Sequence, residues 1–190
     1  MIDYLRNTSK VTTLGLWGRS MGAVTALMFA DKDPSIAGMV LDSPFTSLSE
    51  LSLELAKKHS SVPEWIVGIV MSYIKKTIKE NAGFDITELN PLKNNAPCSF
   101  VPAYFICATE DELIDPTHTK RLHEVYTGEK IFKEVDGTHN SERDQVTNDS
   151  IAIFFHNVLR VDDLGIEKSD GLTTIEKMER IWELGADCGY

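Results

Sequence analysis

Residues 11–30 of the chain run VTTLGLWGRSMGAVTALMFA, and this stretch decides the fold. Its first seven residues are mostly apolar or β-branched, which predicts a buried strand, and its last ten are small and apolar, which predicts a helix against that strand. The five residues that span their junction, GRSMG at 18–22, have the form Gly-x-Ser-x-Gly. A serine on so tight a turn has a strained backbone, so we expect small residues on either side, Gly18 and Gly22.

A turn of this kind prepares Ser20 to act as a nucleophile. It lifts the hydroxyl clear of the sheet, and the helix that follows directs its N-terminus at the oxyanion that forms during acyl transfer. We therefore predict Ser20 as the nucleophile and the backbone N–H of Met21 as half of an oxyanion hole.

A serine nucleophile needs a base, and the base needs a carboxylate to orient it. Two loops that each follow a predicted strand provide such groups, Thr-Glu-Asp-Glu at 109–112 and Asp-Gly-Thr-His-Asn at 136–140. We predict Asp111 as the orienting acid and His139 as the base, because both can converge on Ser20 at the carboxyl ends of the strands.

Other carboxylates and histidines are weaker candidates. Asp115 precedes a proline, the arrangement of a helix N-cap. Glu110 and Glu112 are near enough in sequence to replace Asp111, and Asp42 ends another strand, where it could serve as the acid or stabilise a turn. The remaining histidines lie inside predicted helices or end one: His118, His123, His156 and His59.

Strand and helix patterns alternate along most of the chain, which is typical of an α/β protein with a mostly parallel sheet. We predict one domain over residues 1–160, with a possible helical cap inserted at about 60–96 and an acidic tail over 161–190. The amphipathic stretch 63–79 forms either that cap or one more helix on the sheet; residues 172–184 form a second amphipathic helix or a solvated extension. The expected strands lie at 11–17, 36–42, 103–108 and 130–135, and the expected helices at 2–7, 21–30, 48–59, 63–79, 90–95, 115–126 and 143–159.

The composition limits the classes of partner, cofactor and compartment that we expect for this protein. The net charge of −10 argues against nucleic acid, because phosphate binding needs concentrated lysine and arginine. Three widely spaced cysteines without a CxxC pair indicate a reducing compartment and no zinc site. The first 20 residues lack the features of a signal peptide, and the longest apolar run, 65–71, is too short to span a bilayer, so we expect a cytoplasmic protein. No GxGxxG or phosphate-binding loop follows a strand, and we predict no cofactor and no metal.

Four short motifs extend these predictions: LWGRSMGA at 16–23, LDSPF at 41–45, Asp-x-x-Ile-x-Pro at 111–116 and Gly-x-His-Asn at 137–140. Together they resemble the α/β-hydrolases grouped with serine aminopeptidase S33-like proteins, over roughly residues 1–160. The resemblance implies Ser20 as nucleophile, Asp111 as acid and His139 as base. The chain departs mildly from the family at Ala108, where glycine is more frequent.

The resemblance also implies an eight-stranded sheet, of which this chain contributes the last four strands. The early strands and the His-Gly loop that gives a second oxyanion N–H have no counterpart, and the strand at 11–17 would then lie at an unprotected edge. We expect a truncated form of a longer enzyme, in which the missing N-terminal half completes the sheet. Loss of one oxyanion donor typically lowers the rate by about 10² to 10³.

The predicted function is hydrolysis of an ester, thioester or amide through an acyl-enzyme on Ser20, with a small acyl substrate or a peptide. The alternative is a truncated or non-catalytic α/β-hydrolase-fold protein that acts in partner binding.

Overall fold

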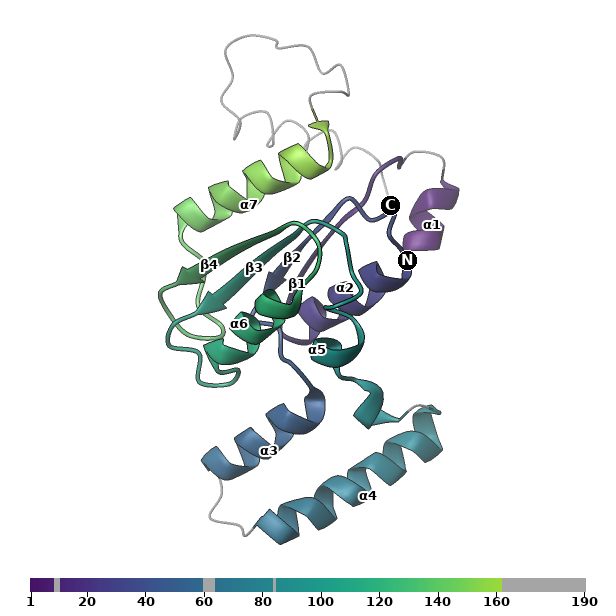
Figure 1. The fold of residues 1–190 in the computed structure, drawn as a ribbon, viewed down its shortest axis with the longest axis vertical. Coiled ribbons are helices and arrows are strands. Elements are labelled where there is room, and N and C mark those ends of the chain that lie inside the picture. Colours follow the sequence, from purple (N-terminus) through teal and green to yellow (C-terminus); the bar gives the residue numbers. More distant parts are fainter. Residues whose placement is uncertain (9–10, 60–63, 84, 162–190) are drawn as a thin grey trace. The chain divides into compact units, whose positions relative to one another are not determined.

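The computed structural model of the chain describes residues 1–8, 11–59, 64–83 and 85–161 (Figure 1). Met1–Leu159 form one compact unit, and residues from 160 onward belong to a second. The helix predicted at 172–184 lies outside the described residues. The elements of the first unit are α1 (Ile2–Asn7), β1 (Gly15–Arg19), α2 (Met21–Lys32), β2 (Gly38–Asp42), α3 (Leu48–His59), α4 (Glu64–Ala82), the 3₁₀-helix η1 (Ile86–Glu88), α5 (Pro91–Asn94), β3 (Ala103–Ala108), α6 (Pro116–Val125), β4 (Lys130–Val135) and α7 (Gln145–Val158).

The four strands form one parallel sheet in the order β1-β2-β3-β4. Parallel neighbours need a long crossover connection, and helices supply it each time. This arrangement confirms the predicted α/β fold with a parallel sheet. Strands β3 and β4 have the predicted bounds, and the other elements lie close to their predicted positions.

Both faces of the sheet are covered, so alternate residues along a strand enter two different cores. Leu41 of β2 and Phe105 of β3 pack in one core with residues of α2 and α6. Their neighbours Val40 and Ile106 pack in the other core with residues of α7. Figure 1 shows α7 on one side of the sheet and α2 and α6 on the other. Because a strand places successive side chains on opposite faces, burial on both faces explains why these strands are continuously apolar.

The first strand differs from its prediction. It begins at Gly15 rather than Val11 and continues through Arg19, which pairs with Asp42 of β2. The start is later because β2, the neighbour of β1, itself begins only at Gly38. Gly18 is therefore part of the ladder, and the turn is compressed into Ser20 alone.

In the part of the chain that the structure describes, β1 has a neighbour on one side only. This agrees with the edge position expected for it. Trp17 of β1 is 56% exposed, and an apolar hollow of 230 Å³ lies between α1, β1 and α2.

The segment between β2 and β3 contains α3, α4, η1 and α5. The short α5 contacts α2 and α6 and so belongs to the layer on the sheet. Helices α3 and α4 contact each other and η1, and α3 is also joined to α6 by side-chain bonds such as that between Glu54 and His118. The outer face of α4 carries exposed apolar side chains, Ile69, Val70 and Tyr73. The assignment of this segment as a cap stays a prediction. No described helix combines the length and the hydropathy needed to cross a membrane.

Candidate active site

Ser20 occupies the point where β1 turns into α2. Its φ of 56° and ψ of −121° lie in a region that residues other than glycine rarely adopt, and it serves as the N-cap of α2. The backbone N–H of Ser20 donates to the carbonyl oxygen of Asp42 at 2.8 Å, which ties the turn to the end of β2. The structure thus places the predicted nucleophile on a strained strand-to-helix turn at the carboxyl end of the sheet.

The two glycines of the motif differ. A Cβ atom at Gly18 would lie within 2.5 Å of backbone atoms of Gly22 and Ala23, so this position tolerates no side chain. A Cβ atom at Gly22 would meet no described heavy atom within 4 Å. Among the described residues, the structure gives a steric reason for a small residue at Gly18, whereas Gly22 borders the hollow lined by Leu16 and Trp17; the requirement at Gly22 stays a prediction.

Met21 is the first residue of α2, and its side chain is exposed. The first N–H groups of a helix have no carbonyl partner within the helix, and the helix dipole adds partial positive charge at the same end. The Met21 N–H next to Ser20 has this character, which suits it to stabilise an oxyanion.

Asp111 and His139 form a buried pair. Nδ1 of His139 lies 2.7 Å from Oδ2 of Asp111, and the two residues are 4% and 9% exposed. Oδ1 of Asp111 accepts the N–H groups of Leu113 and Ile114 at 3.0 and 2.8 Å. These bonds fix the carboxylate, and an ionised carboxylate can only accept, so we assign the Nδ1 proton of neutral His139 to this bond. Nε2 is then left unprotonated, as a general base requires.

Ser20, Asp111 and His139 all follow the carboxyl ends of strands, so the structure brings them to the same edge of the sheet. The acid and the base are in contact. Among the described residues, no hydrogen bond joins the Ser20 hydroxyl to His139. Bonds between a nucleophile and its base are often long in unliganded enzymes and shorten when substrate binds.

The structure gives the alternative acids other tasks. Asp42 is fully buried and bound by two arginines, Arg19 and Arg143, with a shortest N–O distance of 2.8 Å in each pair. Asp115 caps α6 by accepting the N–H of Thr117 at 2.9 Å, as predicted. Glu110 and Glu112 are exposed.

The other histidines whose contacts are described serve packing. His118 is buried, with Nδ1 2.7 Å from the Thr46 hydroxyl and Nε2 2.7 Å from Glu54 of α3. The ring of His123 packs between Phe105 and Phe132. Within the described ranges, no group of three or more His, Cys, Asp or Glu side chains is arranged to hold a metal ion.

Sequence reasoning missed the two arginines on Asp42. A signal was present, since a carboxylate that ends a buried strand must find a cationic or hydrogen-bonding partner. The sequence does not tell which of its 19 lysines and arginines provides it.

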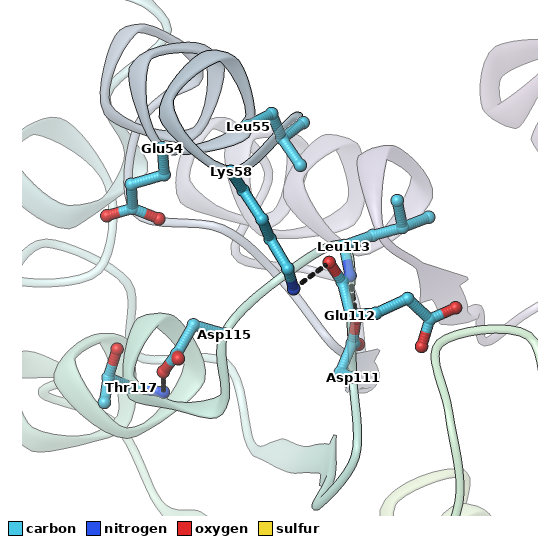
Figure 2. A pocket seen from close by; sticks show the side chains of 8 residues that line it. All are labelled: Glu54, Leu55, Lys58, Asp111, Glu112, Leu113, Asp115 and Thr117. Atoms are coloured by element: carbon cyan, nitrogen blue, oxygen red, sulfur yellow. Dashed lines mark hydrogen bonds between the residues drawn. The ribbon is translucent and has the colours of Figure 1, made fainter. Parts of the chain in front are cut away.

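A cavity of 330 Å³ lies between Asp111 and residues of α3 (Figure 2). Lys58 reaches across it from α3 and donates to the backbone carbonyl of Glu112 at 2.7 Å. Neither Ser20 nor His139 lines this cavity.

Comparison with models of known protein families finds no match. The chain is 27% identical over 143 residues to the uncharacterized protein YqkD of Bacillus subtilis; the match covers 73% of this chain and 46% of YqkD. The chain thus spans less than half of the length of this relative.

Solved structures with the same fold include esterase Pf2001 of Pyrococcus furiosus and the acetyl xylan esterase of Paenibacillus sp. R4. The first has a TM-score of 0.57 at 22% identity, covering 84% of this chain and 58% of the esterase. The second has a TM-score of 0.61 at 16% identity, covering 82% of this chain and 49% of the esterase. These likenesses show the fold alone: the parallel sheet and the helices on its two faces are arranged as in the α/β-hydrolase fold of these esterases.

Proposed function

We propose that this protein is a serine hydrolase that cleaves an ester, thioester or amide through an acyl-enzyme on Ser20. One observation carries the proposal. The buried pair of Asp111 and His139 lies at the same edge of the sheet as a serine with a positive φ, and acyl-transfer enzymes of this kind use an acid, a histidine and such a serine from strand ends at one edge.

The reaction follows from these positions. Nε2 of His139 removes the hydroxyl proton while Oγ of Ser20 attacks the acyl carbon, and the Met21 N–H donates to the oxyanion. The imidazolium gives the proton to the leaving group as the scissile bond breaks. Water then attacks the acyl-serine with His139 again as base, which releases the acid and restores the hydroxyl. Asp111 holds the ring and stabilises its charged form.

The names of the similar structures guide the choice of substrate. Two of them are esterases, which makes acyl esters of graded chain length the first compounds to assay. Proteins with this fold catalyse many different reactions, so the assay itself has to identify which kind of bond is cleaved.

A fluorophosphonate probe tests the proposal, because it reacts covalently with an activated serine. We expect labelling of the wild type at Ser20 and none in Ser20→Ala. Ser35→Ala is the matched control: Ser35 precedes β2, at the opposite end of this strand from Asp42, and its loss should leave labelling intact. A folded wild type that the probe does not label contradicts the proposal and favours a non-catalytic binding protein.

A further inference from the structure

The order of the strands places Ser20 and His139 after strands that are not neighbours in the sheet. Ser20 follows β1 and His139 follows β4, and these strands are separated by β2 and β3. Neighbouring strands lie about 4.8 Å apart, so the two strand ends are about 14 Å from each other. The loop that carries His139 must therefore return across the end of β3 and be held there.

Asp42 ends β2, between β1 and β4, and it is bonded both to the turn at Ser20 and to the end of the histidine loop. Its backbone carbonyl accepts the N–H of Ser20 at 2.8 Å. Its Oδ2 accepts from Nε of Arg19 at 2.8 Å and from Nε of Arg143 at 3.0 Å, and its Oδ1 accepts from Nη2 of Arg143 at 2.8 Å. One buried carboxylate thus joins the residue before the nucleophile to the residue that ends the histidine loop.

The same arginines reach the backbone on both sides of His139. Nη1 of Arg143 donates to the carbonyl oxygen of Thr138 at 3.2 Å and to that of Ser141 at 3.4 Å, and Nη1 of Arg19 donates to the latter at 3.3 Å. The loop also closes on itself, since Oγ of Ser141 accepts the Thr138 N–H at 2.9 Å. His139 therefore lies in a short turn whose two ends are held by guanidinium groups.

From this geometry we infer that Asp42, Arg19 and Arg143 are positioning residues that hold the histidine loop over Ser20. The inference rests on the proposed function, because it assigns the network a role in that reaction. None of the three residues has to touch the substrate. Asp111 orients the ring about Nδ1, whereas the network places the backbone that carries the ring.

The hydrogen bonds argue for more than a structural ion pair. A buried ion pair alone is a poor device for stability, because desolvation offsets much of the attraction. Here the forked guanidinium groups donate both to Asp42 and to the carbonyls that bracket the base, a pattern that needs several donors in a fixed plane. Lysine keeps the charge, but its three N–H donors radiate from one nitrogen on a flexible stem, so it does not reproduce the planar fork whose separate nitrogens reach the carboxylate and the loop carbonyls together.

Arg143→Lys in the full chain tests the inference, with Arg6→Lys as the matched control. Arg6 pairs with Asp33 at 2.7 Å and bonds Ser35, at the opposite end of β2 from Asp42. We expect Arg143→Lys to lower kcat and the rate of fluorophosphonate labelling by about 10- to 100-fold with little change in KM, because misplacing a catalytic group by about 1 Å costs that much. Arg6→Lys should change neither.

Hydrogen exchange supplies a readout that does not depend on turnover. In Arg143→Lys the amides of Thr138 and Ser141 should exchange faster than in the wild type, while those of β3 stay protected. Arg19→Lys is a second variant. Because the Arg19 side chain is 34% exposed, its replacement disturbs the fold less, and it should show a weaker fall in kcat and a weaker rise in exchange.

The outcomes separate the two proposals. A wild type that is labelled, together with lysine variants that are folded and labelled equally fast, overturns the positioning role and leaves the hydrolase intact. A folded wild type that is not labelled overturns the hydrolase proposal and the catalytic role of the network with it. A fall in kcat that comes with unchanged exchange in the loop also contradicts positioning.

Discussion

A Cβ atom added to Gly18 would stand 2.2 Å from the carbonyl carbon of Gly22. This contact joins the end of β1 to the first turn of α2. The atoms that the added Cβ would meet belong to the backbone, so they cannot move away by a change of side-chain rotamer. The close approach lets the chain reverse at Ser20 within one residue. The two glycines of the motif therefore differ: a side chain at Gly18 would clash with backbone, and one at Gly22 would meet no described atom.

Gly18→Ala should therefore destabilise the protein by at least about 3 kcal/mol, at the upper end of the cost of overpacking. Gly22→Ala should be neutral or raise the free energy of unfolding by up to about 1 kcal/mol, because alanine is the better helix former. Urea denaturation of the two variants measures the difference. Equal losses for both would show that the motif needs two small residues.

Asp111→Asn should lower kcat by about 10⁴ with a small change in KM, because an amide N–H facing Nδ1 favours the ring tautomer that has its proton on Nε2. Steady-state kinetics with an acyl ester measures the effect. Asp115→Asn is the control, since Asp115 lies in the same loop region but caps α6. A similar loss in both variants would mean that the loop, and not the pair with His139, matters.

The Asp115 cap should give α6 a pH-dependent stability. The backbone N–H of Thr117, and then its hydroxyl, hold the pKa of Asp115 below its ordinary value of 3.8. Because the folded pKa is the lower one, the stabilisation is present above that ordinary value and is lost as pH falls through the folded pKa.

Asp115→Ala should accordingly lower the free energy of unfolding by about 1 kcal/mol at neutral pH. The deficit should shrink as the pH falls below the ordinary value of 3.8 and through the lower pKa of the folded carboxyl. Denaturant unfolding across this range measures it, and Asp115→Asn, which still caps, should show a smaller deficit throughout. A deficit that is independent of pH would contradict the charged cap.

Cys98 and Cys107 should differ strongly in reactivity. Burial in β3, with the Glu134 carboxylate as a lesser cause, raises the pKa of Cys107 to about 11, whereas Cys98 is exposed. At pH 8 the Cys107 thiolate is then about one part in a thousand, and the thiolate is the reactive form. Iodoacetamide followed by peptide mapping should find Cys98 modified first. Unfolding in urea should bring the two rates together, and equal rates in the folded protein would exclude this burial.

Much of the site could be predicted from local patterns. Strands β3 and β4 are short, apolar and bounded by turns, so their ends were predictable, and with them the positions of Asp111 and His139. The contact between these two residues was expected because parallel strands end at the same edge. The start of β1 was not predictable in this way, because it depends on where its neighbour begins.

The network on Asp42 could not be predicted for a different reason. Local pattern indicates that a buried carboxylate needs a partner, but one partner, Arg143, lies 101 residues away in sequence, and the other, Arg19, lies on the neighbouring strand. Which long side chain arrives depends on the path of the loop after β4, which Gly137 and the bonds between Thr138 and Ser141 shape only once the loop has folded. Gly18 and Gly22 are a similar case. The motif is symmetric in sequence, but only a side chain at Gly18 would clash with the backbone of α2.

The span between Asp42 and Arg143 has a consequence for how the protein folds. Contacts this distant in sequence close late, because the entropy of a long loop must be overcome before they form. Strands β1, β2 and β3 all precede residue 109, so they can pair without Arg143, whereas the loop at 136–143 lacks this anchor until Arg143 reaches Asp42. We therefore expect the sheet to form first during refolding and the loop to become ordered last.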